Sequence, residues 1–206
     1  MINDKCSMLQ LPKLILASGS PRRAEILRFV GWEFDKQIAD VDESELPNEK
    51  SEDYVQRLAR KKAETVAANY ENALVLGADT IVVIDNQIIG KPKNLADAQR
   101  MLKLLSGRWH EVFTGVALVK KDEKINQNLK IQNPKSAVGL QKTQVKFAEL
   151  SEAEIRLLIE KGEPLDKAGA YAVQAQAALF IEEIQGDYWN VVGLPINLVY
   201  RLATSL

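Results

Sequence analysis

The sequence is poor in the residues that build disulfides and common metal centres. Its 206 residues include a single cysteine, Cys6, and a single histidine, His110. One cysteine excludes an internal disulfide and a multi-cysteine zinc site, and one histidine argues against a histidine-rich metal centre or a Ser/His/Asp triad. We therefore expect carboxylates to hold any bound metal, and we interpret His110 as a packing or surface residue.

Long apolar runs are also missing. No stretch approaches the roughly 20 apolar residues that a membrane-spanning helix needs. Residues 1–10 lack the apolar core of a secretory signal. These absences predict a cytoplasmic protein without a membrane partner.

Neither sign of charge is in clear excess. Lysine and arginine total 27 against 28 aspartates and glutamates, a formal net charge of -1. Such a chain has no overall field that would attract nucleic acid or an anionic membrane. The sequence thus predicts no nucleic-acid partner, and any anion site must be local.

The composition is that of a folded chain, with 46% hydrophobic and 27% charged residues. This length can bury one core or the cores of two small lobes. We expect a single domain over residues 1–206, in which residues 1–12 are a flexible N-terminal extension.

Apolar periodicity predicts alternating strands and helices. The expected helices cover 21–30, 51–69, 95–105, 151–162 and a last segment from Pro195; the expected strands cover 13–16, a short segment at Phe34, 74–84, 87–89, 109–120, 142–147 and 179–184. The polar residues 121–141 are expected to form an exposed hairpin connection. The mixture predicts an α/β protein with a mixed, twisted sheet flanked by helices.

The segment from Lys13 to Arg23 combines an apolar strand, a turn of small residues and two arginines. Ser20 suits the N-cap of a helix and Pro21 its first position. Free N–H groups and the positive end of the helix dipole would then face Ser18, Arg22 and Arg23, a combination suited to phosphate. The alternative is a surface helix start with solvated arginines.

Two charged residues fall on patterns that should be buried. Asp79 lies inside an aliphatic strand, where an ionised carboxylate without a partner would cost several kcal/mol. It is a candidate metal ligand or general base, or else an aspartate hydrogen-bonded to a turn. Lys62 lies on the apolar stripe of a helix, where it should have an anionic partner or a functional role, or else only extends its ammonium group to water.

Three further residues are candidates on weaker grounds. Lys91, between Gly90 and Pro92, is held stiffly enough to meet a phosphate, although it could be a solvated turn lysine. Glu43 could join Asp79 in holding magnesium, or belong to a solvated acidic loop. Gln174 could read a base edge with its amide, or satisfy buried backbone groups.

Together these motifs resemble the Maf family of nucleoside triphosphate pyrophosphatases, once described as septum-formation proteins. The match extends from Leu14 to Leu202. It is carried by Ala17-Ser-Gly-Ser-Pro-Arg-Arg23, Gly77-Ala-Asp-Thr80, Gly90-Lys-Pro92, Leu105-Ser-Gly107, Glu163-Pro-Leu-Asp-Lys-Ala-Gly-Ala-Tyr171 and Val192-Gly-Leu-Pro195. By resemblance we expect two lobes around a central nucleotide-binding cleft, as in Maf and ITPase-like folds.

The resemblance implies hydrolysis of a nucleoside triphosphate between its α and β phosphates, with a divalent cation such as magnesium or manganese. It implies Asp79 as proton acceptor and Glu43 with Asp79 as metal contacts. The implied phosphate contacts are Ser18, Arg22, Arg23, Lys62 and Lys91, and the residues that select the base are Arg22, Thr80 and Gln174. The segment around Gln174 is similar to the branch that acts on dTTP and UTP, and a homodimer is implied.

One departure from the family pattern concerns the base. The family usually has glycine after Gln174, where this chain has Ala175. If the position needs a positive φ, alanine would resist it and narrow the pocket. The alternative function that we consider is a nucleotide-binding regulator of cell division or septum formation that does not turn its ligand over.

Overall fold

The computed structural model describes residues 13–121 and 135–206. The predicted flexible extension, residues 1–12, lies outside the described residues, as does most of the predicted hairpin connection. No helix among the described residues is long and apolar enough to cross a membrane.

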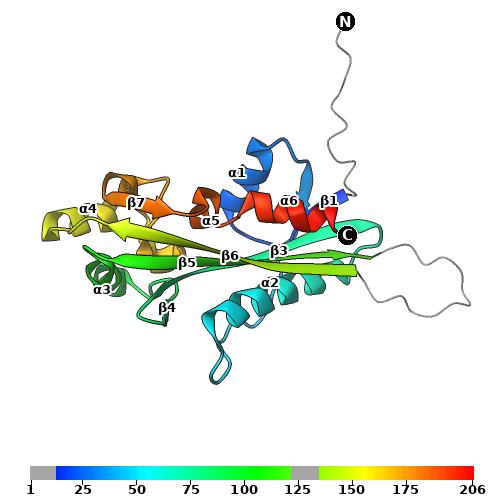
Figure 1. Ribbon diagram of the computed structural model, residues 1–206, viewed down its shortest axis with the longest axis horizontal. Coiled ribbons are helices and arrows are strands. Elements are labelled where there is room, and N and C mark those ends of the chain that lie inside the picture. Colours follow the sequence, from blue (N-terminus) through cyan, green and yellow to red (C-terminus); the bar gives the residue numbers. More distant parts are fainter. Residues whose placement is uncertain (1–12, 122–134) are drawn as a thin grey trace, which may run out of the picture.

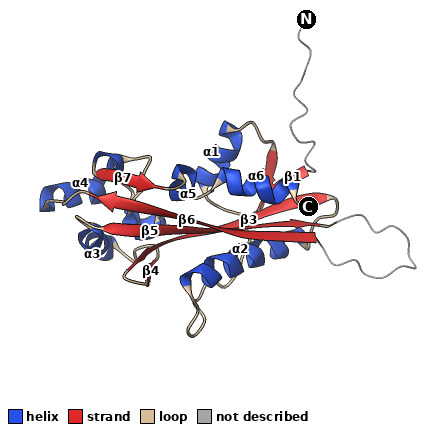
Figure 2. Cartoon of the chain, viewed as in Figure 1, coloured by secondary structure: helices blue, strands red, loops and turns tan. Residues whose placement is uncertain are grey.

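Six α-helices, three short 3-10 helices and seven strands make up the described regular structure (Figures 1 and 2). The helices are α1 (Pro21–Phe29), α2 (Ser51–Ala67), α3 (Leu95–Leu105), α4 (Glu152–Lys161), α5 (Tyr188–Val192) and α6 (Ile196–Thr204). The strands are β1 (Lys13–Leu16), β2 (Phe34–Lys36), β3 (Ala73–Ile84), β4 (Gln87–Ile89), β5 (Trp109–Lys120), β6 (Lys135–Phe147) and β7 (Ile181–Gln185).

The strands form one mixed sheet in the order β2-β1-β3-β5-β6-β7, with β4 paired to the far part of β3. Strand β1 is parallel to both of its neighbours, and the other pairs are antiparallel. The predicted mixed α/β fold is confirmed. The long strands β5 and β6 run through the whole molecule, with α3, α4 and β7 at one end, α1 and α5 near the middle, and β1 and α6 toward the other end (Figure 1).

Local sequence signals place most helix starts. Helix α1 begins at Pro21, and the side chain of Ser20 caps it by accepting from the Arg23 N–H, as predicted. Asn94 caps α3, and Ser151 forms a capping box with Glu154 at the start of α4. The chain leaves α1 through Gly31, whose φ of +73° is the left-handed conformation that commonly ends a helix.

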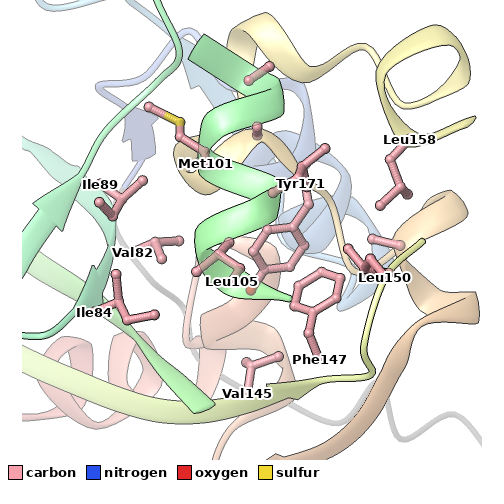
Figure 3. Packing of buried hydrophobic residues seen from close by; sticks show 14 of the residues in the cluster. Val82, Ile84, Ile89, Met101, Leu105, Val145, Phe147, Leu150, Leu158 and Tyr171 are labelled. Atoms are coloured by element: carbon pink, nitrogen blue, oxygen red, sulfur yellow. The ribbon is translucent and has the colours of Figure 1, made fainter. Parts of the chain in front are cut away.

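Alternate residues of β3 face opposite sides of the sheet. Val82 and Ile84 pack with α3, Phe147 and Tyr171 in the core shown in Figure 3. On the other side, Val75 packs against α2. These two cores give the sheet a covered face on each side.

Helix α2 lies unusually close to the sheet because glycines face it. A Cβ atom at Gly77 would lie 2.2 Å from the carbonyl oxygen of Ala59, and one at Gly115 would lie 2.2 Å from that of Val55. Any larger residue would therefore force the helix away. This close approach brings the side chains of α2 to the middle of β3.

Some predicted boundaries were wrong. Strand β6 begins at Lys135 rather than at 142, since residues 135–141 pair with β5 throughout. Only Lys135, Ser136 and Gln141 of this stretch are polar, and its side chains are half-buried or exposed, with Val138 and Leu140 packed against buried clusters. Strand β7 covers Ile181–Gln185, preceded by a short 3-10 turn at Gln176–Leu179, and α5 was not predicted because five residues are too short to show a helical period.

Candidate active site

A cleft of about 630 Å³ opens between the two ends of the molecule. Its wall includes every site residue predicted from the sequence: Ser18, Arg22, Arg23, Glu43, Lys62, Asp79, Thr80, Lys91 and Gln174. These residues come from α1, α2, β3 and four connecting segments. The structure therefore brings the whole predicted set to one cavity, and it confirms the expected two-lobed arrangement around a cleft.

The sheet topology explains where the cleft lies. Strand β1 sits between two parallel neighbours, so the chain leaves it through α1 to reach β2 and returns through α2 to reach β3. Such a reversal opens a crevice at the carboxyl ends of the strands. Strand β3 pairs with β1 up to Leu76 and with β4 only from Val82, so its edge between them faces the crevice.

The turn between β1 and α1 has the features of the predicted anion cradle. The Ser20 N–H donates to Ser18 Oγ over 3.2 Å, and the Arg23 N–H donates to Ser20 Oγ over 3.4 Å. Pro21 has no N–H and the Ala24 N–H donates to the Ser20 carbonyl over 3.5 Å, so in the first turn of α1 the Arg22 N–H is left for a ligand, and Arg22 lines the cleft. This end of the cleft can accept a negatively charged group.

Arg23 is buried and tied to the protein by each of its nitrogens. Nε donates to the Gly193 carbonyl over 2.8 Å, Nη1 to Ser18 Oγ and the Ala78 carbonyl over 2.9 Å each, and Nη2 to Thr80 Oγ1 over 3.0 Å. Burial lowers the pKa of this guanidinium, and the nearby Asp79 opposes that shift. Arg23 therefore contributes positive charge to the cleft while it fixes the turn, the β3 edge and Gly193 relative to one another.

Asp79 and Lys62 form a buried ion pair at the centre of the cleft. The ammonium nitrogen of Lys62 lies 2.6 Å from Asp79 Oδ1 and 2.7 Å from Glu43 Oε1. Asp79 and Lys62 are each only 8% exposed, whereas the Glu43 side chain is 55% exposed. The predicted alternative for Lys62, an ammonium group extended to water, is wrong, because that group lies between two carboxylates.

The two carboxyl groups differ in pKa because their burial differs. Burial raises the pKa of Asp79 above its ordinary value, although the charges of Lys62 and Arg23 oppose the shift. Burial also acts on Glu43, but there the hydrogen bond and charge of Lys62 prevail and the pKa is lowered. Asp79 is therefore the more basic carboxylate of the pair, as a proton acceptor requires.

Helix α2 holds the acidic segment that carries Glu43. The Tyr54 hydroxyl donates to the Glu43 carbonyl over 2.8 Å, and Arg57 pairs with Glu49 over 2.5 Å. Lys61 reaches the Asp42 carbonyl over 3.3 Å. Burial and the charges of Asp79 and Glu43 raise the pKa of Tyr54 to about 12, so its hydroxyl keeps its proton at neutral pH.

Two charged residues at the rim, Asp166 and Lys167, were missed as site residues. Arg22 contacts Asp166 over 3.4 Å, and the buried Lys167 donates to the same carboxylate over 2.7 Å. The N–H of Gly169, at φ +69°, donates to the Gly90 carbonyl and holds this segment beside Lys91. The sequence feature that could have identified these two residues is their position as a charged pair just before the turn at Gly169.

Two of the residues implied to select the base differ in the hydrogen bonds that their side chains already make within the protein. The Thr80 hydroxyl is engaged with Arg23 and with Thr114 Oγ1 at 2.9 Å. Gln174 is exposed on the cleft wall, and no hydrogen bond joins its side chain to another described residue. The expectation that Ala175 narrows the pocket through a positive φ was wrong, since its φ is −120° and it does not line the cleft.

Carboxylates are the metal-ligating groups that the cleft offers. Within residues 13–121 and 135–206, no group of three or more histidine, cysteine, aspartate or glutamate side chains is placed to hold a metal ion. Glu43 and Asp79 do converge, and both oxygens that meet there are bound by Lys62. Two carboxylates are the number that Mg²⁺ commonly takes from a protein when phosphates and water complete its shell.

The chain is similar to curated proteins along nearly its whole length. It is 47% identical over 195 residues to a dTTP/UTP pyrophosphatase of Symbiobacterium thermophilum, which covers 95% of this chain and 94% of that protein. It is 46% identical over 191 residues to a protein of the same name from Bacillus cytotoxicus, covering 93% of this chain and 94% of that protein.

The fold is also found in a solved structure, that of the Staphylococcus aureus Ham1 protein. The two share 12% sequence identity with a TM-score of 0.50, over 94% of this chain and 98% of the other. At that identity the likeness concerns the fold. The model of the family described as "Maf-like protein" matches residues 13–206, and with relatives of this similarity the chain belongs to the Maf family.

Proposed function

We propose that this protein is a hydrolase that cleaves dTTP and UTP to the nucleoside monophosphate and pyrophosphate. The observation that carries the proposal is the meeting of a buried carboxylate with several cations in one cleft, in a chain about half identical to proteins named dTTP/UTP pyrophosphatase. Phosphoanhydride cleavage needs such a combination, because negative charge grows on the leaving pyrophosphate while water is deprotonated.

In the proposed reaction a water molecule attacks the α phosphorus in line with the leaving pyrophosphate. Asp79 orients this water and accepts its proton, which its raised pKa favours. The N–H of Arg22 at the start of α1 and the side chains of Arg22 and Lys91 bind the phosphate oxygens. Asp79 is buried, and the exclusion of bulk water strengthens its interactions with the charged groups around it.

A divalent cation fits the donor set of the cleft. Glu43 and Asp79 would hold it, since they present carboxylate oxygens to the same point. When bound with a nucleotide, magnesium or manganese would neutralise charge on the phosphates.

Partners and location form a further part of the proposal. The triphosphate is the expected partner, and the family resemblance adds a homodimer and a house-cleaning role directed at modified pyrimidine nucleotides. Because nucleoside triphosphates are made and used inside cells, the expected compartment is the cytoplasm. Sedimentation equilibrium tests the dimer separately from the activity.

A substrate panel tests the function. The full chain is incubated with magnesium and each canonical triphosphate, together with modified pyrimidine triphosphates, and pyrophosphate and monophosphate are measured. Release of both products in equal amounts, fastest with dTTP and UTP, supports the proposal. Saturable binding without product would favour a nucleotide-binding regulator, and preference for a purine triphosphate would contradict the substrate assignment.

A further inference from the structure

Lys62 is placed where a metal ion would otherwise sit. Its ammonium nitrogen lies 2.6 Å from Asp79 Oδ1 and 2.7 Å from Glu43 Oε1, so one cation bridges both carboxylates. No other ion pair reaches either carboxylate within the part of the chain that the structure describes. Lys62 is therefore the main counter-ion of both groups.

Arg23, the neighbouring cation, forms no ion pair with Asp79 or Glu43. Arg23 feels the charge of Asp79, but its nitrogens donate to Gly193, Ser18, Ala78 and Thr80 rather than to a carboxylate. Asp79 is buried, so without Lys62 its charge would lack a direct partner. The bridge is thus the feature that makes the empty cleft electrostatically stable.

A free divalent cation would have to compete with this bridge. It needs the same carboxylate oxygens, and an ammonium group a few ångströms away would repel its double charge strongly at this depth. A triphosphate changes the balance, because its oxygens supply both metal ligands and an acceptor for the Lys62 ammonium.

The lysine can change partners while its helix stays in place. Helix α2 is fixed against the sheet at Gly77 and Gly115, where no Cβ would fit. The four-carbon side chain of Lys62 can still move its ammonium group from the carboxylates to a phosphate.

We infer that Lys62 is a built-in counter-ion that blocks free metal and gives way to the metal–nucleotide complex. The metal and the triphosphate then enter together, and Lys62 passes from the Glu43–Asp79 bridge to the phosphates. This inference rests on the proposed function, because it assigns an order of binding to the same cleft.

Metal binding to the protein without nucleotide tests the inference. Mn²⁺ is titrated into the parent, Lys62→Met and Arg60→Met proteins and followed by calorimetry. We expect Lys62→Met to bind free Mn²⁺ at least about tenfold more tightly than the parent, because the blocking charge is gone. Arg60→Met is the matched control: Arg60 is exposed on the same helix, no hydrogen bond or ion pair joins its side chain to another described residue, and this variant should bind as the parent does.

A second substitution locates the gained site. Glu43→Gln added to Lys62→Met should abolish the gain, since it removes one of the two carboxylates. Equal Mn²⁺ affinity in the parent and Lys62→Met proteins, or a gain that survives Glu43→Gln, would overturn the inference.

The parent protein supplies a measurement that does not depend on the variant folding. The ¹⁵N resonance of the Lys62 ammonium should stay unchanged when Mg²⁺ is added alone, and it should shift when Mg²⁺ is added with α,β-methylene-UTP. A shift with Mg²⁺ alone would contradict the order of binding. Pyrophosphate release by the parent is scored separately, so loss of the inference leaves the proposed function standing, and absence of release rejects that function.

Discussion

The guanidinium Nε of Arg23 donates to the carbonyl oxygen of Gly193 over 2.8 Å, joining residues 170 positions apart in the sequence. Gly193 ends α5 with φ +118°, and its carbonyl also lies 3.3 Å from the Thr80 hydroxyl. Arg23 therefore links the start of α1 to the turn before α6 and to the exposed edge of β3. This one side chain therefore holds together three segments that line the cleft.

Arg23→Lys should lose both stability and activity. Lysine keeps the charge, but a single ammonium cannot replace donors that reach Gly193, Ala78 and Thr80 in different directions. We expect a loss of about 2–4 kcal/mol in the free energy of unfolding by urea denaturation, with kcat/KM for dTTP at least about tenfold lower. Arg28→Lys, at an exposed position of α1, is the control and should change neither. Parental behaviour of Arg23→Lys would contradict the assigned role.

His110 should make the fold sensitive to acid. It is buried, with Nε2 2.7 Å from the Tyr171 hydroxyl, and burial lowers its pKa from 6.5 to about 4. The unfolded chain gains a proton near pH 6.5 while the folded protein stays neutral, so the free energy of unfolding falls as the pH is lowered from 6.5 toward 4. The full effect is about 3 kcal/mol.

His110→Gln isolates this contribution, since glutamine can still reach a hydroxyl but does not titrate. Urea unfolding of the parent and the variant is compared at steps between pH 7 and pH 4. The difference in stability between them should change in favour of the variant as the pH falls. A difference that is the same at every pH would show that His110 titrates alike in both states.

Gly77→Ala should separate α2 from the sheet. The new Cβ would meet the Ala59 carbonyl and the Ala63 N–H, which belong to backbone and cannot turn aside. We expect a loss of at least about 1–3 kcal/mol in stability and reduced dTTP hydrolysis, because Lys62 would move relative to Asp79. Gly90→Ala, where a Cβ meets nothing within 4 Å, is the control for stability. Equal melting temperatures for the two variants would contradict the packing argument.

Base selection should depend on Gln174 and not on Ala175. Gln174 lines the cleft with a free amide, whereas Ala175 is extended and does not line the cleft. Gln174→Ala should lower the ratio of kcat/KM for UTP over CTP about tenfold, because a hydrogen bond to the correct base is lost. Ala175→Gly should leave that ratio within about twofold of the parent. A larger change of this ratio in Ala175→Gly than in Gln174→Ala would contradict the prediction.

Local sequence patterns were enough for much of the fold. The aliphatic run of β3, the helical stripe of α3 and the capping box of α4 each specify their element without distant partners. The extension of β6 to Lys135 was missed because Lys135, Ser136 and Gln141 obscure the apolar residues between them, and pairing with β5 makes this stretch a strand. Helix α5 is capped by Asp187 but is too short to be recognised from its period.

The sequence was enough to name the residues of the candidate site, but it did not show which of them form ion pairs and hydrogen bonds with one another. Motifs marked Asp79 and Lys62 separately, whereas their ion pair depends on how closely Gly77 lets α2 approach β3. The hydrogen bonds of the Arg23 guanidinium could not be predicted either, because most of their acceptors lie far away in the sequence, on β3 and directly after α5. Asp166 entered the site through its contact with Arg22, 144 positions away.

The most direct test of the central claim, that Asp79 accepts the proton of the attacking water, is turnover of dTTP by Asp79→Asn with magnesium. Asparagine keeps the shape of the side chain but cannot take the proton. The account predicts that pyrophosphate release falls at least about a hundredfold while the variant remains folded and still binds α,β-methylene-UTP. Release of pyrophosphate by Asp79→Asn at the parental rate would contradict it.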